Sequence, residues 1–224
     1  MRKFLIFVCM LSATALLGRA EVIERVVAVV NGQAILLSEW DTAARLEALL
    51  NHKPLDSIDD ASRRATFERM IDQQLLRGEM QNSSVTRTSP ENIAAKLREI
   101  RQQYPEASTD AQWTALLARY GVAQEEVEAG VTTELDGLRL LDFRLRSSAQ
   151  PDAAQINRYY LTVYEPAMRS KRAKPAPLAE VTPQIREILV QERLADLTTA
   201  WLQTLRSQAH IQLNVKTAEG PAKP

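Results

Sequence analysis

Cysteine, glycine and aromatic residues are scarce in this chain of 224 residues. Cys9 is the single cysteine, seven residues are glycine, and aromatic side chains make up 5%. This composition, rich in Ala, Leu, Glu, Gln and Arg, favours helices over a β-sandwich. The 28 basic residues equal the 28 acidic ones, so there is no excess of positive charge for nucleic-acid binding. We expect a mainly α-helical fold of one large domain or two small ones.

Residues 1–20 are predicted to be a cleavable signal peptide. Arg2 and Lys3 precede an apolar run at residues 4–17, and small residues stand before Glu21, which is the pattern of a secretory signal. As a helix the run covers only about 21 Å, less than the ~30 Å hydrocarbon core of a bilayer, so a membrane anchor is the weaker alternative. We therefore expect a periplasmic protein, or one at the outer face of the cell if the host has a single membrane.

Cleavage after Ala20 would leave 25 basic and 28 acidic residues, a net charge of −3, and no cysteine. Disulfides, thiol nucleophiles and thiolate metal ligands are then excluded. Glycine-rich phosphate-binding loops and serine-nucleophile motifs are also absent. His52 and His210 lack metal-ligand spacing, and the acidic residues at 59–60 and 125–128 fall where helices are predicted to begin. We expect no catalytic residue, no cofactor and no metal.

A small sheet is predicted from the two ends of the chain. Two β-prone runs flank Asn31-Gly32, which is a strong signal for a hairpin with a type I′ turn. A lone hairpin is barely stable in water, so this one must find another strand or a helix face. The only other short β-like run is at residues 210–214. We predict that this run pairs with the hairpin and joins the two ends in one domain, 21–164 with 182–214.

Apolar periodicity predicts helices over most of the intervening chain. The expected ranges are 39–51, 59 or 60 to 82, 91–104, 109–120, 123–147, a shorter helix after residue 152, and 183–209. Several begin at recognisable caps, namely Ser38 with Asp41 as a capping box, Asp59 or Asp60, Ser89 before Pro90, Ser108 or Thr109, and Thr182 before Pro183.

Residues 165–181 interrupt the helical pattern. It contains three prolines and four basic residues, namely Arg169, Lys171, Arg172 and Lys174. The segment is predicted to be a solvated linker or an extended surface excursion, with contact of its basic residues to an anionic partner or a membrane as the functional alternative. Residues 215–224 are polar, contain Gly and Pro, and are predicted to be disordered.

Four stretches share their order and spacing with one known family. They are residues 26–32 (VVAVVNG) leading to Ser38-Glu39, residues 67–76 (FERMIDQQLL), the segment from Trp113 to Gly121, and residues 201–206 (WLQTLR) followed by Ala209 and Ile211. Together they extend over about 190 residues, from Glu21 to Leu213, and resemble the SurA family of periplasmic chaperones. The resemblance implies an elongated helical chaperone core whose clients are unfolded or partly folded exported proteins, above all precursors of outer-membrane β-barrels.

The chain departs from this family between its last two long helices. SurA-like chains usually carry one or two parvulin-type prolyl isomerase domains there, but here the gap from Pro151 to Thr182 is only about thirty residues long. The chain therefore resembles the chaperone core without the isomerase. A residual isomerase is a remaining alternative, which the two separated histidines do not favour.

A chaperone that works without ATP needs exposed apolar surface and weak contacts, because release must be passive; a micromolar affinity corresponds to about −8 kcal/mol. Grooves between long helices would supply that surface. Candidate lining residues are Met70, Met80, Trp113, Tyr120, Leu138, Leu141 and Phe143. The alternative for each is an ordinary place in the core.

A different function also stays open, that of an exported helical module with one dedicated folded partner. Weak self-association is compatible with either function, whereas nucleic-acid binding and a stable membrane anchor after signal cleavage are not expected.

Overall fold

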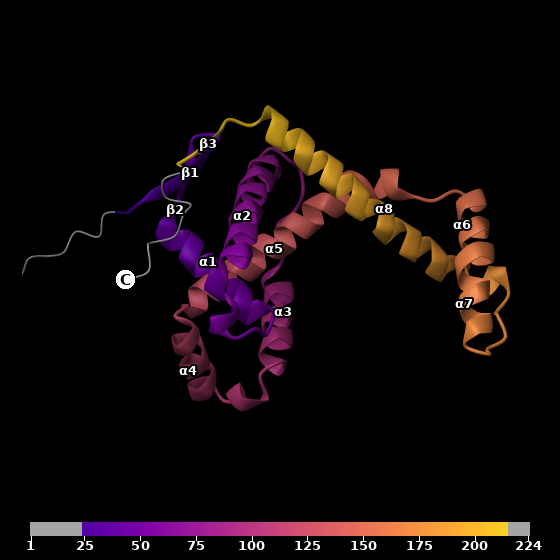
Figure 1. The fold of residues 1–224 in the computed structure, drawn as a ribbon, viewed down its shortest axis with the longest axis horizontal. Helices are drawn as coiled ribbons and strands as arrows, with labels where there is room; N and C mark the ends of the chain where they lie inside the picture. Colours follow the sequence, from indigo (N-terminus) through magenta and orange to yellow (C-terminus); the bar gives the residue numbers. More distant parts are fainter. Residues whose placement is uncertain (1–23, 215–224) are drawn as a thin grey trace, which may run out of the picture.

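The structure is a computed structural model that describes residues 24–214. Helices dominate these residues, as expected, and their β structure is one small sheet (Figure 1). The elements in chain order are β1 (Val26–Val30), β2 (Gln33–Leu36), α1 (Leu37–Leu50), η1 (Leu55–Ser57), α2 (Asp60–Gln81), α3 (Pro90–Gln102), η2 (Pro105–Ala107), α4 (Asp110–Tyr120), α5 (Gln124–Leu145), η3 (Arg146–Ala149), α6 (Ala153–Tyr159), η4 (Tyr160–Tyr164), α7 (Glu165–Ser170), α8 (Leu178–Gln208) and β3 (Ile211–Leu213). The predicted signal peptide, 1–20, and the predicted disordered tail, 215–224, lie outside the described residues.

The hairpin of β1 and β2 turns at Asn31-Gly32, as the sequence predicted. Asn31 has φ 49° and Gly32 has φ 84°, and positive φ at both central positions is the requirement of a type I′ turn. Val30 pairs with Gln33 across the turn. The local sequence therefore sets the register next to the turn, from Ala28 to Val30, and the register shifts at an irregularity between Val26 and Ala28.

Strand β3 completes the sheet from the far end of the chain. The strand order is β2-β1-β3, and both pairings with β1 are antiparallel. The Asn31 N–H donates to the His210 carbonyl, and the His210 N–H donates to Asn31 Oδ1, each at 2.9 Å. The prediction that the two ends of the chain pair is confirmed, and β3 gives the hairpin the third strand that it needs.

Two apolar cores hold together the body, which we define as the sheet with α1–α5. The first lies between the sheet, α1 and α2 and includes Val30, Trp40 and Ile71. The second lies among α1, α3, α4 and α5, where the Tyr104 hydroxyl donates to the carbonyl of the fully buried Leu49 at 2.6 Å. The burial of these side chains provides most of the stability of the body.

Helix α1 begins differently from the prediction. The capping box of Ser38 and Asp41 does not form, because the helix already begins at Leu37 and its first turn is closed by the Leu36 N–H donating to the Glu39 carboxylate at 2.9 Å. The Ser38 hydroxyl instead donates to Glu24 at 2.9 Å, and Asp41 forms an ion pair with α2. Strand β2 leads directly into the helix, so the N-cap position is Leu36, the last residue of the strand, and not Ser38.

The other predicted caps of the body are present. The Asp59 carboxylate accepts the Ser62 N–H at 2.7 Å at the start of α2, and Ser89 and Thr109 cap α3 and α4. Helix α4 ends at Gly121, whose φ of 64° lies in the left-handed region that favours glycine. Local sequence therefore fixes the ends of these helices.

The segment predicted as a linker, 165–181, is helical at both ends. Helix α7 occupies its first six residues, and α8 begins at Leu178, so only residues 171–177 lack helical structure. Helix α7 continues α6 and the π-helical stretch η4. The linker is thus largely folded, contrary to the prediction.

The start of the last helix at Thr182-Pro183 was also predicted wrongly. Helix α8 begins five residues before Pro183, which lies inside it. Leu178 and Val181, which precede the proline, pack with Ile156 of α6 in a third apolar cluster. Their burial extends the helix beyond the point at which proline statistics would begin it.

Helix α8 connects two ends of an elongated molecule (Figure 1). Its 31 residues span about 46 Å at 1.5 Å per residue. One end lies beside the sheet (Figure 1), and the other packs against α6 and η4. We call α6, η4 and α7 together the distal lobe. The body thus holds two of the three apolar clusters, and the distal lobe holds the third.

Candidate binding groove

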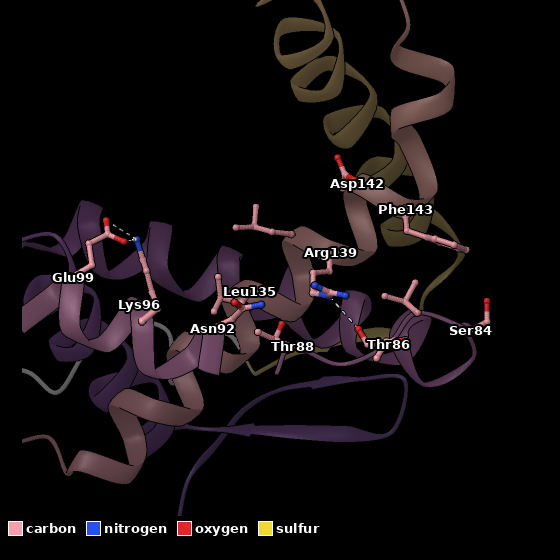
Figure 2. A pocket seen from close by; sticks show the side chains of 13 residues that line it. Ser84, Thr86, Thr88, Asn92, Lys96, Glu99, Leu135, Arg139, Asp142 and Phe143 are labelled. Carbon is pink, nitrogen blue, oxygen red and sulfur yellow. Dashed lines mark hydrogen bonds and ion pairs between the residues drawn. The ribbon is translucent and has the colours of Figure 1, made fainter. Parts of the chain in front are cut away.

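A groove of about 830 Å³ opens between α3 and α5, and the loop of residues 82–89 forms one of its walls (Figure 2). Its apolar lining comes from these three segments, namely Val85, Ala95, Leu135, Leu138 and Phe143. Helix α3 has 13 residues and so is about 20 Å long. That length accommodates about six residues of extended polypeptide at 3.3 Å each.

One buried carboxylate fixes the loop against α5. The side chain of Asp136 is only 7% exposed; it accepts the Thr88 N–H at 2.8 Å and a guanidinium N–H of Arg87 at 2.9 Å. Burial works against the ionised form, but these hydrogen bonds outweigh it and hold the pKa of the Asp136 carboxyl below its ordinary value. One turn further along α5, the Arg139 Nε–H donates to the Thr86 carbonyl at 3.1 Å, as Figure 2 shows.

Two large apolar side chains at the groove are open to solvent. Leu138 is 55% exposed and Phe143 is 61% exposed, and Figure 2 shows Phe143 on α5 near the loop end of the groove. Both stand on the rigid helix α5, so their exposure is a property of the fold. Aromatic and aliphatic side chains exposed beside a groove are characteristic of a surface that binds a partner.

The charges along the groove are balanced. Lys96 forms an ion pair with Glu99 at 3.2 Å on α3, while Arg139 and Asp142 stand on the α5 side. Asp142 is itself paired with Arg146 at 2.9 Å. With two basic and two acidic side chains, the groove does not favour a polyanion or a polycation, and it suits a polypeptide of mixed polar and apolar character.

The structure separates the seven candidate residues of the sequence into surface and core. Leu138 and Phe143 line the groove, and Leu141 is half-buried on the same helix. Met70 lines a second cavity, of about 620 Å³, between α1, α2, α3 and α5. The other three, Met80, Trp113 and Tyr120, are buried and are therefore not available to a client.

The buried aromatic candidates are held by internal hydrogen bonds. The Trp113 indole N–H donates to Gln124 Oε1 at 2.7 Å, and the Tyr120 hydroxyl donates to the Lys53 carbonyl at 2.8 Å. Both side chains belong to the core among α1, α3, α4 and α5. Their polar atoms are satisfied inside the protein, as buried polar groups require.

No sequence pattern predicted a place at the groove for the loop of residues 82–89 or for the apolar side chains of Val85, Ala95 and Leu135. One signal for them was available in the sequence. Asp136 lies between Leu135 and Leu138 in the predicted helix of residues 123–147, and a carboxylate that the fold buries there needs a partner from another segment. That partner is the loop, which brings Val85 and Thr86 to the groove.

The two histidines lie apart from the groove. His52 follows α1 in a left-handed conformation, and its ring lies 4.4 Å from that of Tyr104. His210 borders β3. Among residues 24–214, no group of His, Cys, Asp and Glu is arranged to hold a metal ion. In the same range, no helix is long and apolar enough to span a bilayer.

A family model described as "SurA-like N-terminal domain" matches residues 2–140, which is more than half of the chain. The chain belongs to the SurA-like chaperone family. The match includes α3, the loop of residues 82–89 and α5 as far as Leu140, and hence most of the groove. Between α5 and α8 of this SurA-like chain lie only η3, α6, η4 and α7, and residues 24–214 contain no parvulin domain.

Solved structures that resemble this SurA-like chain include one from Campylobacter jejuni. That structure is described with the words "The virulence factor PEB4 and the periplasmic protein Cj1289 are two structurally related SurA-like chaperones in the human pathogen Campylobacter jejuni". The sequence identity is 11%, the alignment covers 84% of this chain and 98% of the other, and the TM-score is 0.49. No curated protein matches the sequence.

Proposed function

We propose that this chain is an ATP-independent periplasmic chaperone that holds unfolded or partly folded exported proteins, especially precursors of outer-membrane β-barrels, in the groove between α3 and α5. The observation that supports this proposal is the exposure of Leu138 and Phe143 beside a groove of balanced charge. Membership of the SurA-like family supports the same role. No catalytic step is proposed.

The groove suits weak and reversible binding. Burying about 300 Å² of apolar surface contributes up to ~7 kcal/mol at 25 cal/mol per Å², before the costs of association and of ordering the client are subtracted. The apolar lining makes few specific demands on a ligand, since neutral side chains from three segments form it. A chaperone that releases its clients without ATP needs this low specificity and modest affinity.

Barrel precursors have a pattern that fits such a groove. Their strands alternate apolar and polar residues over about ten positions. An extended segment about six residues long would place alternate apolar side chains against Leu135, Leu138 and Phe143, while its polar side chains face Lys96, Glu99 and solvent. This complementarity supports barrel precursors as clients.

The test is suppression of aggregation of an unfolded outer-membrane barrel protein. We expect the double substitution Leu138→Ser with Phe143→Ser to weaken client binding about tenfold or more, because each side chain loses roughly 1 kcal/mol of apolar burial. A matched control is Leu161→Ser with Val163→Ser, since these side chains on η4 are 52% and 45% exposed and lie in the distal lobe. Equal suppression by both variants and the unsubstituted chain would contradict the proposed site.

Two further measurements separate the alternatives. Recovery of one stoichiometric folded partner from periplasmic extract, in place of many unfolded proteins, would favour a dedicated interaction module. Acceleration of cis–trans exchange in a proline peptide would show isomerase activity. We expect many clients and the uncatalysed rate of exchange, which is tens to hundreds of seconds at 25 °C.

A further inference from the structure

The end of the distal lobe carries a concentration of positive charge. Residues 166–177, which we call the basic tip, include no acidic residue and four basic ones, Arg169, Lys171, Arg172 and Lys174, all of them exposed. The other described residues carry 19 basic and 26 acidic side chains. The molecule is therefore polarised, with a positive tip on an otherwise negative chain.

The backbone holds the basic tip in a defined turn. Helix α7 ends with the Ala173 N–H donating to the Met168 carbonyl at 3.0 Å and the Arg172 N–H donating to the Arg169 carbonyl at 2.9 Å. This pair of bonds is a Schellman motif, in which glycine usually occupies the left-handed position. Here Arg172 occupies it, with φ 56°.

Most of the basic charge at the tip is uncompensated. Arg169 pairs with Glu165 at 3.0 Å, but Lys171, Arg172 and Lys174 form no ion pair within residues 24–214. The tip lies at the far end of α8 from the sheet (Figure 1). Its charges can therefore meet a large flat surface without interference from the acidic body.

Exposed apolar side chains lie close to the tip along the chain. Leu161 is 52% exposed and Val163 is 45% exposed on η4, in the continuous helical stretch that leads into α7. Arg169 stands eight positions after Leu161, which is about 12 Å along a helix. Basic and apolar side chains together are the composition that binds at the interface of an anionic bilayer.

We propose that the basic tip is a second binding site, which docks the distal lobe reversibly on an anionic membrane surface. Lys171, Arg172 and Lys174 would contact lipid phosphates, and Leu161 with Val163 would reach the boundary between headgroups and acyl chains. An acidic polypeptide would use the charges but has no need of the exposed apolar pair, so the lipid surface fits better. This site does not depend on the chaperone function proposed for the groove.

The test uses the exported form of the chain, purified from a bacterial periplasm, and its co-sedimentation with lipid vesicles. We expect binding to vesicles rich in phosphatidylglycerol, little binding to pure phosphatidylcholine vesicles, and weakening with added salt. The triple substitution Lys171→Gln, Arg172→Gln and Lys174→Gln should lower the partition coefficient about a hundredfold, because each basic side chain near an anionic surface contributes about a factor of five.

A matched control removes the same charge from the body. Arg64, Arg98 and Arg119 are exposed on α2, α3 and α4, and changing all three to Gln should alter the partition coefficient less than about threefold, since they lie away from the contact. Equal losses in both triple variants, or equal binding to neutral vesicles, would overturn the proposal. Tighter binding to soluble polyglutamate than to anionic vesicles would also overturn it and would assign the tip to acidic polypeptides.

Discussion

At the scale of single residues, Asp136 does the most to shape the groove. Its carboxylate is buried and holds Arg87 and the Thr88 N–H, and the same helix exposes Leu138 two residues later. A buried charge is tolerated only when hydrogen bonds replace the lost water. The loop that supplies these bonds also supplies one wall of the groove, so the stability of the fold and the shape of the site depend on the same carboxylate.

Replacing Asp136 with Asn should lower the free energy of unfolding by about 2 kcal/mol at neutral pH, because charge-assisted hydrogen bonds become neutral ones and the Arg87 bond is lost. The folded-state pKa of Asp136 lies below the ordinary 3.8, so its contribution is complete above that value and is lost as the pH falls through the lower folded-state pKa. Urea unfolding of both chains should therefore show a difference at pH 7 that shrinks below about pH 4. A difference that does not depend on pH would contradict this account.

Arg172 offers a second test at this scale. A residue with a side chain in the left-handed region costs roughly 1 kcal/mol relative to glycine, and Arg172 has φ 56°. Arg172→Gly should therefore raise the free energy of unfolding by about 1 kcal/mol in urea titrations. Arg169→Gly, at a helical position of α7, should lower it by a similar amount. A loss of stability in both variants would show that the Arg172 side chain makes contacts that outweigh the strain.

Residue patterns in the sequence were reliable where the structure depends on neighbours along the chain. Asn31-Gly32 and the cap at Asp59 could be predicted because the turn and the first helical turn involve only adjacent residues. Ser38 could not be placed correctly, because its partner Glu24 belongs to the hairpin. Trp113 could not be assigned to core or groove from periodicity, since an apolar residue looks the same in both places.

At the scale of elements, two arginines form ion pairs between α8 and the rest of the protein, and their partners differ in exposure to solvent. Arg206 binds α2 through Asp72 and Glu68, each at 2.6 Å, and through the Glu68 carbonyl at 3.0 Å. Its hydrogen bond to Asp72, with support from Glu68, raises the pKa of Arg206 despite partial burial. Near the distal lobe, Arg146 of η3 joins Glu187 of α8 at 2.8 Å, but both side chains are about half exposed.

Replacing Arg206 with Gln should lower the free energy of unfolding by about 1–2 kcal/mol, since three hydrogen bonds between α8 and α2 are lost and Asp72 is left partly buried without its cation. Arg146→Gln is the matched control, and its effect should be smaller because solvent and salt screen an exposed pair. Chemical denaturation at low and high salt would check both. Equal losses in the two variants would show that burial is not what separates these contacts.

The sequence predicted most of the helices and strands, but it did not always predict the residues at which they begin and end. Periodicity located α2–α5 because each has a broad apolar face. The start of α8 was missed because it depends on packing around Ile156 and Ile185 in the distal lobe. Helix α7 was missed because it continues the helical stretch of α6 and η4, although Pro166 lies in its first turn. Prolines and basic residues indicate a linker locally, and only the folded chain shows that residues 165–170 continue the helical stretch of α6 and η4.

At the scale of the whole molecule, the two ends of the chain close the sheet, while α8 carries the distal lobe away from it (Figure 1). Pairing of the ends could be predicted because a hairpin alone lacks a partner. The groove could not be located in the same way, since it requires α3, α5 and the loop of residues 82–89 in their folded positions. The groove and the basic tip belong to different parts of this elongated molecule, which allows each to be altered without the other.

Strand β3 therefore decides whether the N-terminal hairpin is stable. A chain that ends after Gln208 loses β3, its pairing with Ala28, Val29 and Val30, and the backbone bond from Asn214 to Val27. We expect it to lose several kcal/mol of stability or to remain unfolded, because a two-stranded hairpin is marginal in water. A chain that ends after Asn214 keeps every one of these contacts and should unfold at the same temperature as the full chain. Thermal unfolding followed by circular dichroism compares the two, and equal midpoints would show that the helical body holds the hairpin without its third strand.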